Sequence, residues 1–309
     1  MTRVAALDCG TNSLRLLVAD IDGHMLTDVV RRMEVVRLGA GVDRTGQLAP
    51  EALARTFGVL DDYAAELRAL DVEAVRMVAT SATRDASNRE EFVAGVRQRL
   101  GIDPEVVTGD EEATLSFIGA TRELQGDSEL TTPYLVVDIG GGSTEFVLGD
   151  ASGPMAARSV DVGCVRMTER HLVDDPATEE QIGAARADVV AAIDVARSVV
   201  PVEKAQTLIG LAGSVTTVVA LALGLTEYDA QRIHHSRVSA GDVRRITTEL
   251  LAATRAERTE LPVMHPGRVD VIGGGALVLD TIMAEGGFAD VVASEHDILD
   301  GIAFSLVSE

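Results

Sequence analysis

The sequence is poor in basic residues and has almost no lysine. Lys and Arg together number 27 against 49 Asp and Glu, which gives a formal net charge of -22. A nucleic-acid-binding surface needs a basic footprint that displaces counterions from phosphates, so this charge argues against DNA or RNA as a partner. The single lysine, Lys204, stands in Val-Glu-Lys-Ala-Gln rather than Gly-Lys-Ser/Thr, which excludes a Walker-type P-loop.

Long apolar runs and cysteine patterns are also missing. No run of about 18 uncharged apolar residues occurs, and the N-terminus passes directly into a strand-like stretch around Asp8. We therefore expect no membrane span and no signal peptide, and a cytoplasmic location. The two cysteines, Cys9 and Cys164, are too few for a disulfide scaffold or a Cys-based zinc site and are expected to be free thiols.

The most informative pattern present is an internal repeat. Residues 4–20 read VAALDCGTNSLRLLVAD and residues 134–150 read YLVVDIGGGSTEFVLGD, so that Asp, Gly and Ser recur 130 positions apart (138 minus 8). Each copy is typical of a strand, a glycine-rich turn and a second strand. The length of 309 residues, with 46% hydrophobic residues, favours about two domains. We therefore predict two related lobes that face each other across a cleft.

Strands, glycine turns and helices alternate through both halves, which is typical of α/β sheets. Helices are predicted near 51–70, 89–100, 109–124, 165–172 and 178–200, strands at 75–79, 105–107, 207–209 and 269–272, a loop at 80–88, and glycine turns at 210–214 and 273–275. The polar segment 125–133 is predicted to link the lobes. The lobes are thus 1–126 and 127–294, with a last helix over 295–309 that joins the first lobe.

Both repeated turns suit phosphate, because glycine backbone and small hydroxyl donors can approach an oxyanion closely. The candidates are Thr11, Asn12 and Ser13 in the first turn, and Gly140, Gly141, Gly142 and Ser143 in the second. An ordinary hairpin turn is the alternative for either one alone. Asp8 and Asp138 precede the turns, where they could hold Mg²⁺ through water, and Glu145 lies further along the second copy. Alternatively, an Asp caps its turn through an Asx hydrogen bond.

Other residues carry weaker signals. Glu111 and Glu112 begin a predicted helix, where the helix dipole favours carboxylates, so spacing alone indicates a structural role. Arg84 follows a predicted strand and could bind phosphate with its planar guanidinium. Cys9 has the C-x5-R spacing of cysteine phosphatases, but a strand rather than a helix follows, so a nucleophilic thiolate is not expected. The adjacent His234 and His235 should point apart on a helix, and the histidines are interpreted as structural.

A set of motifs, taken together, resembles the Ppx/GppA phosphatase family over essentially the whole chain. These motifs are Asp8-x-Gly-Thr-Asn-Ser-x-Arg15, Val36-Arg37-Leu38-Gly39, Thr80-Ser81-Ala82-x-Arg84, Gly109-x-Glu111-Glu112-Ala113, Asp138-Ile-Gly-Gly-Gly-Ser-Thr-Glu145, Gly163-Cys-Val-Arg166, Ala212-Gly213-Ser214-Val-Thr-Thr217 and Pro266-Gly267-Arg268. The resemblance implies the duplicated α/β fold of actin, Hsp70 and sugar kinases, which is ribonuclease H-like, with an active-site cleft between its two lobes.

The resemblance also implies an activity and assigns roles to residues. It implies Mg²⁺-dependent hydrolysis, with Mn²⁺ as the alternative metal, of the terminal phosphate of polyphosphate or of guanosine pentaphosphate (pppGpp), and usually a homodimer. Glu112 matches the family's catalytic base, Arg84 and the two turns its phosphate-binding residues, Asp138 and Glu145 its metal-associated acids. Asp8 is a further metal candidate, and Arg15 a further phosphate contact. The chain ends at Glu309, as in short two-domain members, so we expect a preference for short polyphosphate.

Two other functions remain as alternatives. A kinase or phosphotransferase of the same superfold would need a nucleotide pocket near residues 210–214 and 273–275. A non-catalytic nucleotide switch would keep its ligand after loss of Glu112. Polyphosphate and pppGpp both present a terminal phosphoryl group, so the turns alone do not rank them.

Overall fold

The computed structural model describes residues 2–23, 25–124 and 130–307. The chain divides into two compact units, the first comprising 1–122 together with 298–309 and the second comprising 123–297. The predicted boundary between residues 126 and 127 and the start of the predicted linker lie outside the described residues. In the part of the chain that is described, no helix has the length and apolar character needed to cross a lipid bilayer.

Unit 1 is built on a five-stranded mixed sheet in the order β3-β2-β1-β4-β5. Its strands are β1 (Thr2–Cys9), β2 (Ser13–Asp22), β3 (Met25–Val35), β4 (Ala74–Ala79) and β5 (Glu105–Val106). Its helices are α1 (Val42–Thr45), α2 (Pro50–Ala69), α3 (Ser81–Asp85), α4 (Arg89–Leu100), α5 (Gly109–Thr121) and α13 (Ile298–Ser305), and a 3₁₀ turn covers Arg122–Leu124. The first three strands pair antiparallel, and β1, β4 and β5 are parallel.

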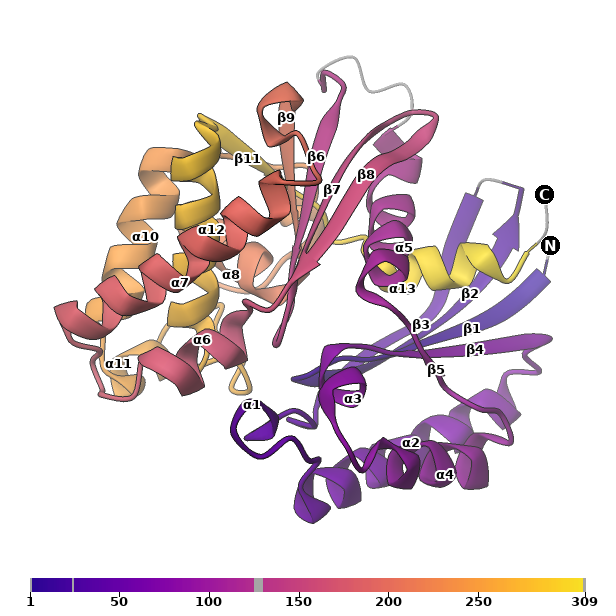
Figure 1. Ribbon diagram of the computed structural model, residues 1–309. Helices are drawn as coiled ribbons and strands as arrows, with labels where there is room; N and C mark the ends of the chain where they lie inside the picture. Colours follow the sequence, from indigo (N-terminus) through magenta and orange to yellow (C-terminus); the bar gives the residue numbers. More distant parts are fainter. Residues whose placement is uncertain (1, 24, 125–129, 308–309) are drawn as a thin grey trace. The chain divides into compact units, whose positions relative to one another are not determined.

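Alternate residues of β1 and β2 face two separate apolar layers (Figure 1). Leu7 and Leu16 belong to the layer covered by α2 and α4, whereas Ala6 and Leu17 belong to the layer covered by α5 and α13. This follows from the two-residue period of a strand. Both layers are apolar, so the strands are buried on both faces and read as continuous hydrophobic runs.

Unit 2 is built on a six-stranded sheet in the order β10-β11-β9-β6-β7-β8. Its strands are β6 (Tyr134–Ile139), β7 (Thr144–Asp150), β8 (Gly153–Val160), β9 (Thr207–Leu211), β10 (Arg237–Ser239) and β11 (Asp290–Ala293). Its helices are α6 (Cys164–His171), α7 (Glu179–Arg197), α8 (Ala212–Ala222), α9 (Ala230–Ile233), α10 (Ala240–Ala252), α11 (Arg255–Thr259) and α12 (Ile272–Gly286), and a 3₁₀ turn covers Val202–Lys204. One sheet face packs on α7, α8 and α12 through a single large apolar cluster.

The predicted strand at 269–272 followed by a glycine turn is wrong. Residues 273–275 lie within the first turns of α12, which begins at Ile272. A Cβ atom at Gly274 would lie 2.7 Å from the Cys164 carbonyl oxygen, and one at Gly275 would lie 2.2 Å from Ser214 Oγ. The glycines are therefore required because α12 packs closely on α6 and α8, and not because the chain turns there.

The predicted loop at 80–88 contains the short helix α3, and the strands β3 and β8 were not predicted. Both strands lie at a sheet edge next to the repeated hairpins, β3 beside β2 and β8 beside β7. Most of β3 is exposed or half-buried, and polar residues stand at Thr27, Asp28, Arg31 and Arg32. An edge strand of this kind lacks the hydrophobic alternation that identifies a strand in a sequence.

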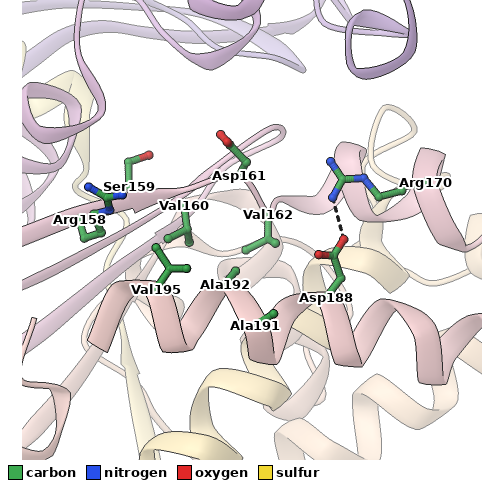
Figure 2. Close-up of a pocket in the computed structure, with 10 residues that line it drawn as sticks. All are labelled: Arg158, Ser159, Val160, Asp161, Val162, Arg170, Asp188, Ala191, Ala192 and Val195. Atoms are coloured by element: carbon green, nitrogen blue, oxygen red, sulfur yellow. Dashed lines mark hydrogen bonds and ion pairs between the residues drawn. The ribbon is translucent and has the colours of Figure 1, made fainter. Parts of the chain in front are cut away.

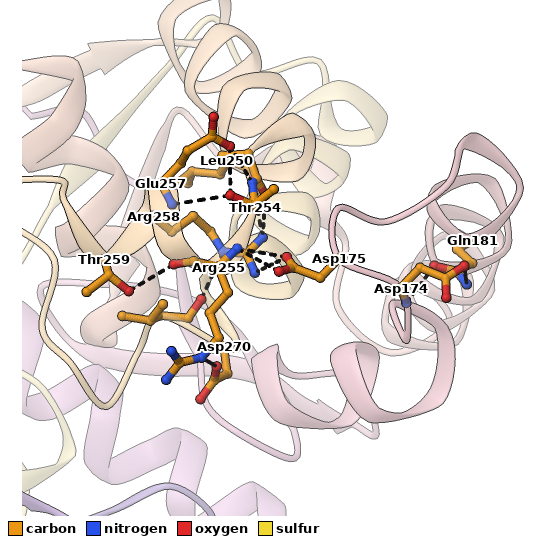
Figure 3. A network of polar contacts seen from close by, with 12 residues as sticks. Asp174, Asp175, Gln181, Leu250, Thr254, Arg255, Glu257, Arg258, Thr259 and Asp270 are labelled. Carbon is orange, nitrogen blue, oxygen red and sulfur yellow. Dashed lines mark hydrogen bonds and ion pairs between the residues drawn. The ribbon is translucent and has the colours of Figure 1, made fainter.

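A polar network joins three loops of unit 2 (Figure 3). Arg258 donates to the carbonyl oxygens of Ala253 at 2.9 Å and Val269 at 3.0 Å, and its Nη2 atom lies 3.1 Å from Asp175 Oδ1. Arg255 adds a hydrogen bond of 2.6 Å from its Nε atom to Asp270. The Arg258 side chain is only 12% exposed. It therefore holds the segments before α7, after α10 and before α12 together.

Candidate functional site

The first repeated turn connects β1 to β2, and the carbonyl oxygens of Thr11 and Asn12 in this turn point toward the segment 36–39. The Thr11 carbonyl accepts from Gly39 N at 2.8 Å, and the Asn12 carbonyl accepts from Val36 N at 3.1 Å and Arg37 N at 2.8 Å. Gly39 approaches so closely that a Cβ atom there would lie 2.3 Å from Thr11 Cγ2. Since the carbonyl and N–H groups of a peptide plane point in opposite directions, the Asn12 N–H is turned away from the 36–39 segment.

Asp8 and Arg15 lie directly opposite each other on β1 and β2. The Arg15 Nε and Nη2 atoms donate to Asp8 Oδ2 at 2.9 and 2.7 Å. Both side chains leave the sheet on the face covered by α5 and α13, and that of Asp8 is 5% exposed. The predicted metal candidate Asp8 is thus already neutralised by the predicted phosphate contact Arg15.

The structure brings Glu112 and Arg84 together, although they are far apart in the sequence. Arg84 Nη1 donates to Glu112 Oε2 at 3.0 Å and to the Val107 carbonyl at 2.9 Å. The Glu112 side chain is 10% exposed and that of Arg84 is 25% exposed. No hydrogen bond to a described residue uses Arg84 Nε or Nη2, so these nitrogens can donate to a ligand while Nη1 fixes the carboxylate.

Glu111, the neighbour of Glu112, has a different environment. Its backbone N–H donates to the N-cap hydroxyl of Thr108 at 3.2 Å, and its carboxylate lies 3.1 Å from Arg76 Nη2. The Glu111 side chain is 45% exposed. Glu111 therefore stabilises the first turn of α5, whereas Glu112 is buried beside Arg84, whose side chain is partly exposed.

The second repeated turn connects β6 to β7 and is held by the start of α6. The Gly140 carbonyl accepts from Cys164 N at 2.9 Å, the Gly141 carbonyl accepts from Val165 N at 2.9 Å, and Arg166 Nε donates to the Gly142 carbonyl at 2.7 Å. A Cβ atom at Gly163 would lie 2.6 Å from the Gly141 carbonyl oxygen, so only glycine permits this approach. Arg166 had no assigned role, although it stands in one of the sequence motifs.

Asp138 and Glu145 lie directly opposite each other on β6 and β7, as Asp8 and Arg15 do in unit 1. Opposed residues of an antiparallel pair project from the same sheet face. This face is opposite to the one packed on α7, α8 and α12, because Val137 and Phe146 belong to that cluster. Asp138 is 7% exposed and Glu145 is 1% exposed. Ser159 on β8 donates a hydrogen bond of 2.7 Å to Glu145 Oε1. Ser159 was not among the predicted site residues.

The chemistry of this pair fits a magnesium ion. Two buried carboxylates supply hard oxygen ligands, and Mg²⁺ commonly takes one or two carboxylates while water and substrate phosphates complete its shell. The repeat places arginine at position 15 of unit 1 and glutamate at position 145 of unit 2. The two pairs therefore differ in charge, and only Asp138 and Glu145 form an all-acidic pair.

A surface pocket of about 320 Å³ lies between the end of β8 and α7 in unit 2 (Figure 2). Val160 and Val162 form an apolar floor toward α7, while Ser159 and Asp161 point to the other side of the strand. Arg170 at the rim is paired with Asp188 at 2.7 Å. The ten lining residues include none of the predicted site residues, and their charges balance, so this pocket is a poor phosphate site.

The histidines are arranged differently from the prediction. The rings of His234 and His235 stack with centroids 3.7 Å apart, and His296 lies 4.7 Å from His234. The expectation that they point apart was wrong because α9 ends at Ile233 and His235 adopts a left-handed backbone with φ 59°. Burial, with the neighbouring rings, lowers the pKa of His234 to about 3. Within the described residues no group of three or more His, Cys, Asp or Glu is arranged to hold a metal.

Both cysteines are free, as predicted, and the structure shows that both are buried. Burial raises the pKa of the Cys9 thiol well above its ordinary value, and the neighbouring Asp8 raises it further. The strand β2 follows the turn after Cys9, so no helix N-terminus stabilises a thiolate there. The cysteine phosphatase spacing is therefore accidental.

The comparisons with known proteins agree with these features. The model of the Ppx/GppA phosphatase family matches residues 17–308. Exopolyphosphatase 2 of Mycobacterium tuberculosis is 50% identical and covers 99% of both chains. A guanosine-5'-triphosphate,3'-diphosphate pyrophosphatase of Vibrio atlanticus is 30% identical over 99% of this chain and 59% of its own length.

Solved structures give the same result. The crystal structure of an exopolyphosphatase-like protein superposes with a TM-score of 0.96 at 46% identity, and covers 99% of this chain and 97% of its own. A Ppx/GppA enzyme of Aquifex aeolicus superposes with a TM-score of 0.82 at 29% identity, and covers 98% and 99%. The two mixed sheets with their repeated hairpins form the duplicated actin-like fold. The chain belongs to the Ppx/GppA phosphatase family.

Proposed function

We propose that this chain is an exopolyphosphatase that hydrolyses the terminal phosphate of inorganic polyphosphate, with Glu112 as the base that activates water. The observation that carries this proposal is the buried carboxylate of Glu112 at the start of α5, which accepts a hydrogen bond of 3.0 Å from Arg84. The exopolyphosphatase relative, 50% identical over 99% of the chain, supports the choice of substrate.

In this reaction Glu112 takes a proton from a water molecule as the water oxygen attacks the terminal phosphorus. A new P–O bond forms, the phosphoanhydride bond to the rest of the chain breaks, and the shortened polyphosphate leaves with the bonding electrons. Arg84 orients Glu112 through Nη1 and neutralises phosphate charge with its other nitrogens. Base catalysis of this kind contributes about 10²- to 10⁴-fold, and positioning and charge neutralisation supply most of the rest.

The two turns bind phosphate oxygens in this proposal. Their outward N–H groups and the hydroxyls of Thr11, Ser13 and Ser143 act as donors, which a chain with a net charge of -22 must provide locally. Asp138 and Glu145 would hold Mg²⁺, or Mn²⁺ in its place. When bound, the metal would neutralise charge on phosphate oxygens.

The pppGpp phosphohydrolase reading is the second candidate. It is favoured by the Vibrio atlanticus relative at 30% identity, whose name gives guanosine-5'-triphosphate,3'-diphosphate, that is pppGpp, as its substrate. The kinase reading loses support because residues 273–275 lie inside α12 rather than in a turn that could hold a nucleotide. We also propose, from the family resemblance, that the chain acts as a homodimer in the cytoplasm, which light scattering and fractionation would test.

The test is phosphate release from short polyphosphate, long polyphosphate, pppGpp and ATP, with Mg²⁺ and with Mn²⁺, for the wild type and for Glu112→Gln. Gln keeps an oxygen that can accept from Arg84 but cannot take a proton from water. We expect the variant to lose about 10²- to 10⁴-fold in kcat. Exposed Glu111→Gln is the matched control and should remain active. If the wild type releases phosphate from none of these substrates, the hydrolase proposal fails.

A further inference from the structure

The turn between β6 and β7 has each of its carbonyl oxygens engaged by the protein. Three of the acceptors are held by main-chain donors: Gly140 O by Cys164 N at 2.9 Å, Gly141 O by Val165 N at 2.9 Å and by Arg166 N at 3.1 Å, and Ser143 O by Gly140 N at 3.1 Å. The fourth, Gly142 O, is held by a side chain, Arg166 Nε, at 2.7 Å.

These bonds decide where the N–H groups of the turn point. The carbonyl of one residue and the N–H of the next share a planar trans peptide unit and point in opposite directions. Anchoring the Gly140, Gly141 and Gly142 carbonyls to α6 therefore directs the N–H groups of Gly141, Gly142 and Ser143 away from α6. None of these three N–H groups donates to an acceptor in the described part of the chain.

In unit 1 the equivalent carbonyl oxygen is held by main-chain donors and not by a side chain. Asn12 is the counterpart of Gly142 in the repeat, and its carbonyl accepts from the backbone N–H groups of Val36 at 3.1 Å and Arg37 at 2.8 Å. In unit 2 the equivalent carbonyl depends on one arginine. Because Gly142 has no Cβ atom to restrict its backbone torsions, the Gly142–Ser143 peptide unit can rotate about the Gly142 Cα–C bond once that hydrogen bond is lost.

We propose that Arg166 is a positioning residue: its Nε atom holds the Gly142 carbonyl so that the Ser143 N–H faces the phosphate of the substrate. This inference rests on the proposed phosphohydrolase function and adds a residue to it. In this proposal the Gly142 carbonyl is held by the Nε atom of Arg166, which lies four bonds from Cα, and the positive charge of the guanidinium is not required. Arg166 lies in the first turn of α6, whose main chain is itself bonded to the turn, so its reach to Gly142 is fixed.

Three substitutions separate this role from its alternatives. Arg166→Gln places an uncharged N–H donor at the same distance along the side chain as the arginine Nε. Arg166→Met has a similar length and no donor, and Arg166→Lys keeps the charge but places its nitrogen one bond further out. Arg170→Met on the same helix is the matched control, because Arg170 pairs with Asp188 at the surface.

We expect kcat/KM for polyphosphate to fall about 10- to 100-fold in Arg166→Met, because a misaligned donor in such a site costs somewhat less than a deleted one. In Arg166→Gln, kcat/KM should remain within about threefold of the wild type. In Arg166→Lys it should be lower than in Arg166→Gln. Thermal unfolding checks that each variant is folded, and the Gln and Lys variants decide the question even where Met destabilises the chain.

Binding of inorganic phosphate, measured by titration calorimetry, should follow the same order and gives a readout independent of turnover. Absence of hydrolysis by the wild type, with phosphate binding still in the order wild type, Gln, Met, would reject the proposed function and leave the positioning role supported. If Lys matches the wild type while Gln matches Met, Arg166 acts by charge and the proposal is overturned. If Met binds and turns over as the wild type does, it is overturned as well.

Discussion

The ion pair between Asp8 and Arg15 leads to the prediction that Arg15→Met destabilises unit 1. The pair lies between β1 and β2, with both donor atoms of Arg15 on a single carboxylate oxygen at 2.7 and 2.9 Å. Methionine is nearly as long as arginine and can occupy the same space. It carries no charge, so the variant leaves the Asp8 carboxylate buried without its arginine.

The magnitude follows from the burial of the two side chains. Removing one partner of a fully buried ion pair costs about 3–5 kcal/mol. The Asp8 side chain is 5% exposed and the Arg15 side chain 19% exposed, so water partly reaches the arginine and the lower end applies, about 3 kcal/mol. This is a large share of the roughly 5–15 kcal/mol that stabilises a typical domain. Asp8→Asn in the same chain removes the unpaired charge, so the double variant should recover most of the loss.

The assay is urea denaturation followed by far-ultraviolet circular dichroism, because the chain has no tryptophan for fluorescence. The wild type, both single variants and the double variant form a double-mutant cycle, which isolates the pairwise interaction. Arg245→Met is the matched control, since Arg245 is exposed on α10 and pairs with Asp242 and Glu249 along one helix. Its midpoint should stay close to that of the wild type.

Two results would refute the reasoning. The pair is not a buried counter-ion pair if Arg15→Met unfolds at the same urea concentration as Arg245→Met. The recovery argument fails if the double variant is less stable than Arg15→Met alone. Unchanged stability with lost phosphate release would instead support Arg15 as a phosphate contact.

Two further predictions concern unit 2. The pKa of His234 is lowered to about 3, so its ring stays neutral in the folded chain, whereas the unfolded chain takes up a proton below about pH 6.5. The contribution of His234 to stability is therefore full above pH 6.5 and declines as the pH falls toward 3. Between pH 7.5 and 5.5 the loss of stability is at most about 1.4 kcal/mol, and about 1 kcal/mol for a partly exposed ring. Urea denaturation at both pH values should show a smaller decline in His234→Asn than in the wild type. Arg258→Met should cost about 2–4 kcal/mol in the same assay, because it leaves the Leu250, Ala253 and Val269 carbonyls without their donor. A loss of stability below about 1 kcal/mol would contradict the inference that the network in Figure 3 stabilises unit 2.

The repeated hairpins could be predicted from the sequence because their residues depend on local geometry. Each turn needs small residues, and each strand is buried on both faces, which leaves the continuous apolar runs around Asp8 and Asp138. The helices α2 and α4 were also predictable, since their apolar residues recur at helical spacing. Strands β3 and β8 were not, because an edge strand meets solvent on much of its surface.

Features that depend on contacts between distant segments could not be predicted. The glycines at 273–275 resemble a turn in the sequence, and only the approach of α6 and α8 explains them. His234 and His235 stack because α9 ends just before them, which a boundary error of one or two residues conceals. For Glu112, spacing alone favoured a structural role, and the family resemblance was needed to identify it as a candidate base.

The helix α13 has a consequence for how the chain is made. Val4, Ala6, Leu17 and Ala19 of the first two strands pack against Leu299, Ile302 and Phe304 of this helix, which follows all of unit 2 in the sequence. A ribosome therefore releases the first hairpin long before it releases the segment that covers one of its faces. During synthesis that apolar face must stay uncovered or be shielded by a chaperone, and unit 1 reaches its final packing only after the last helix has emerged.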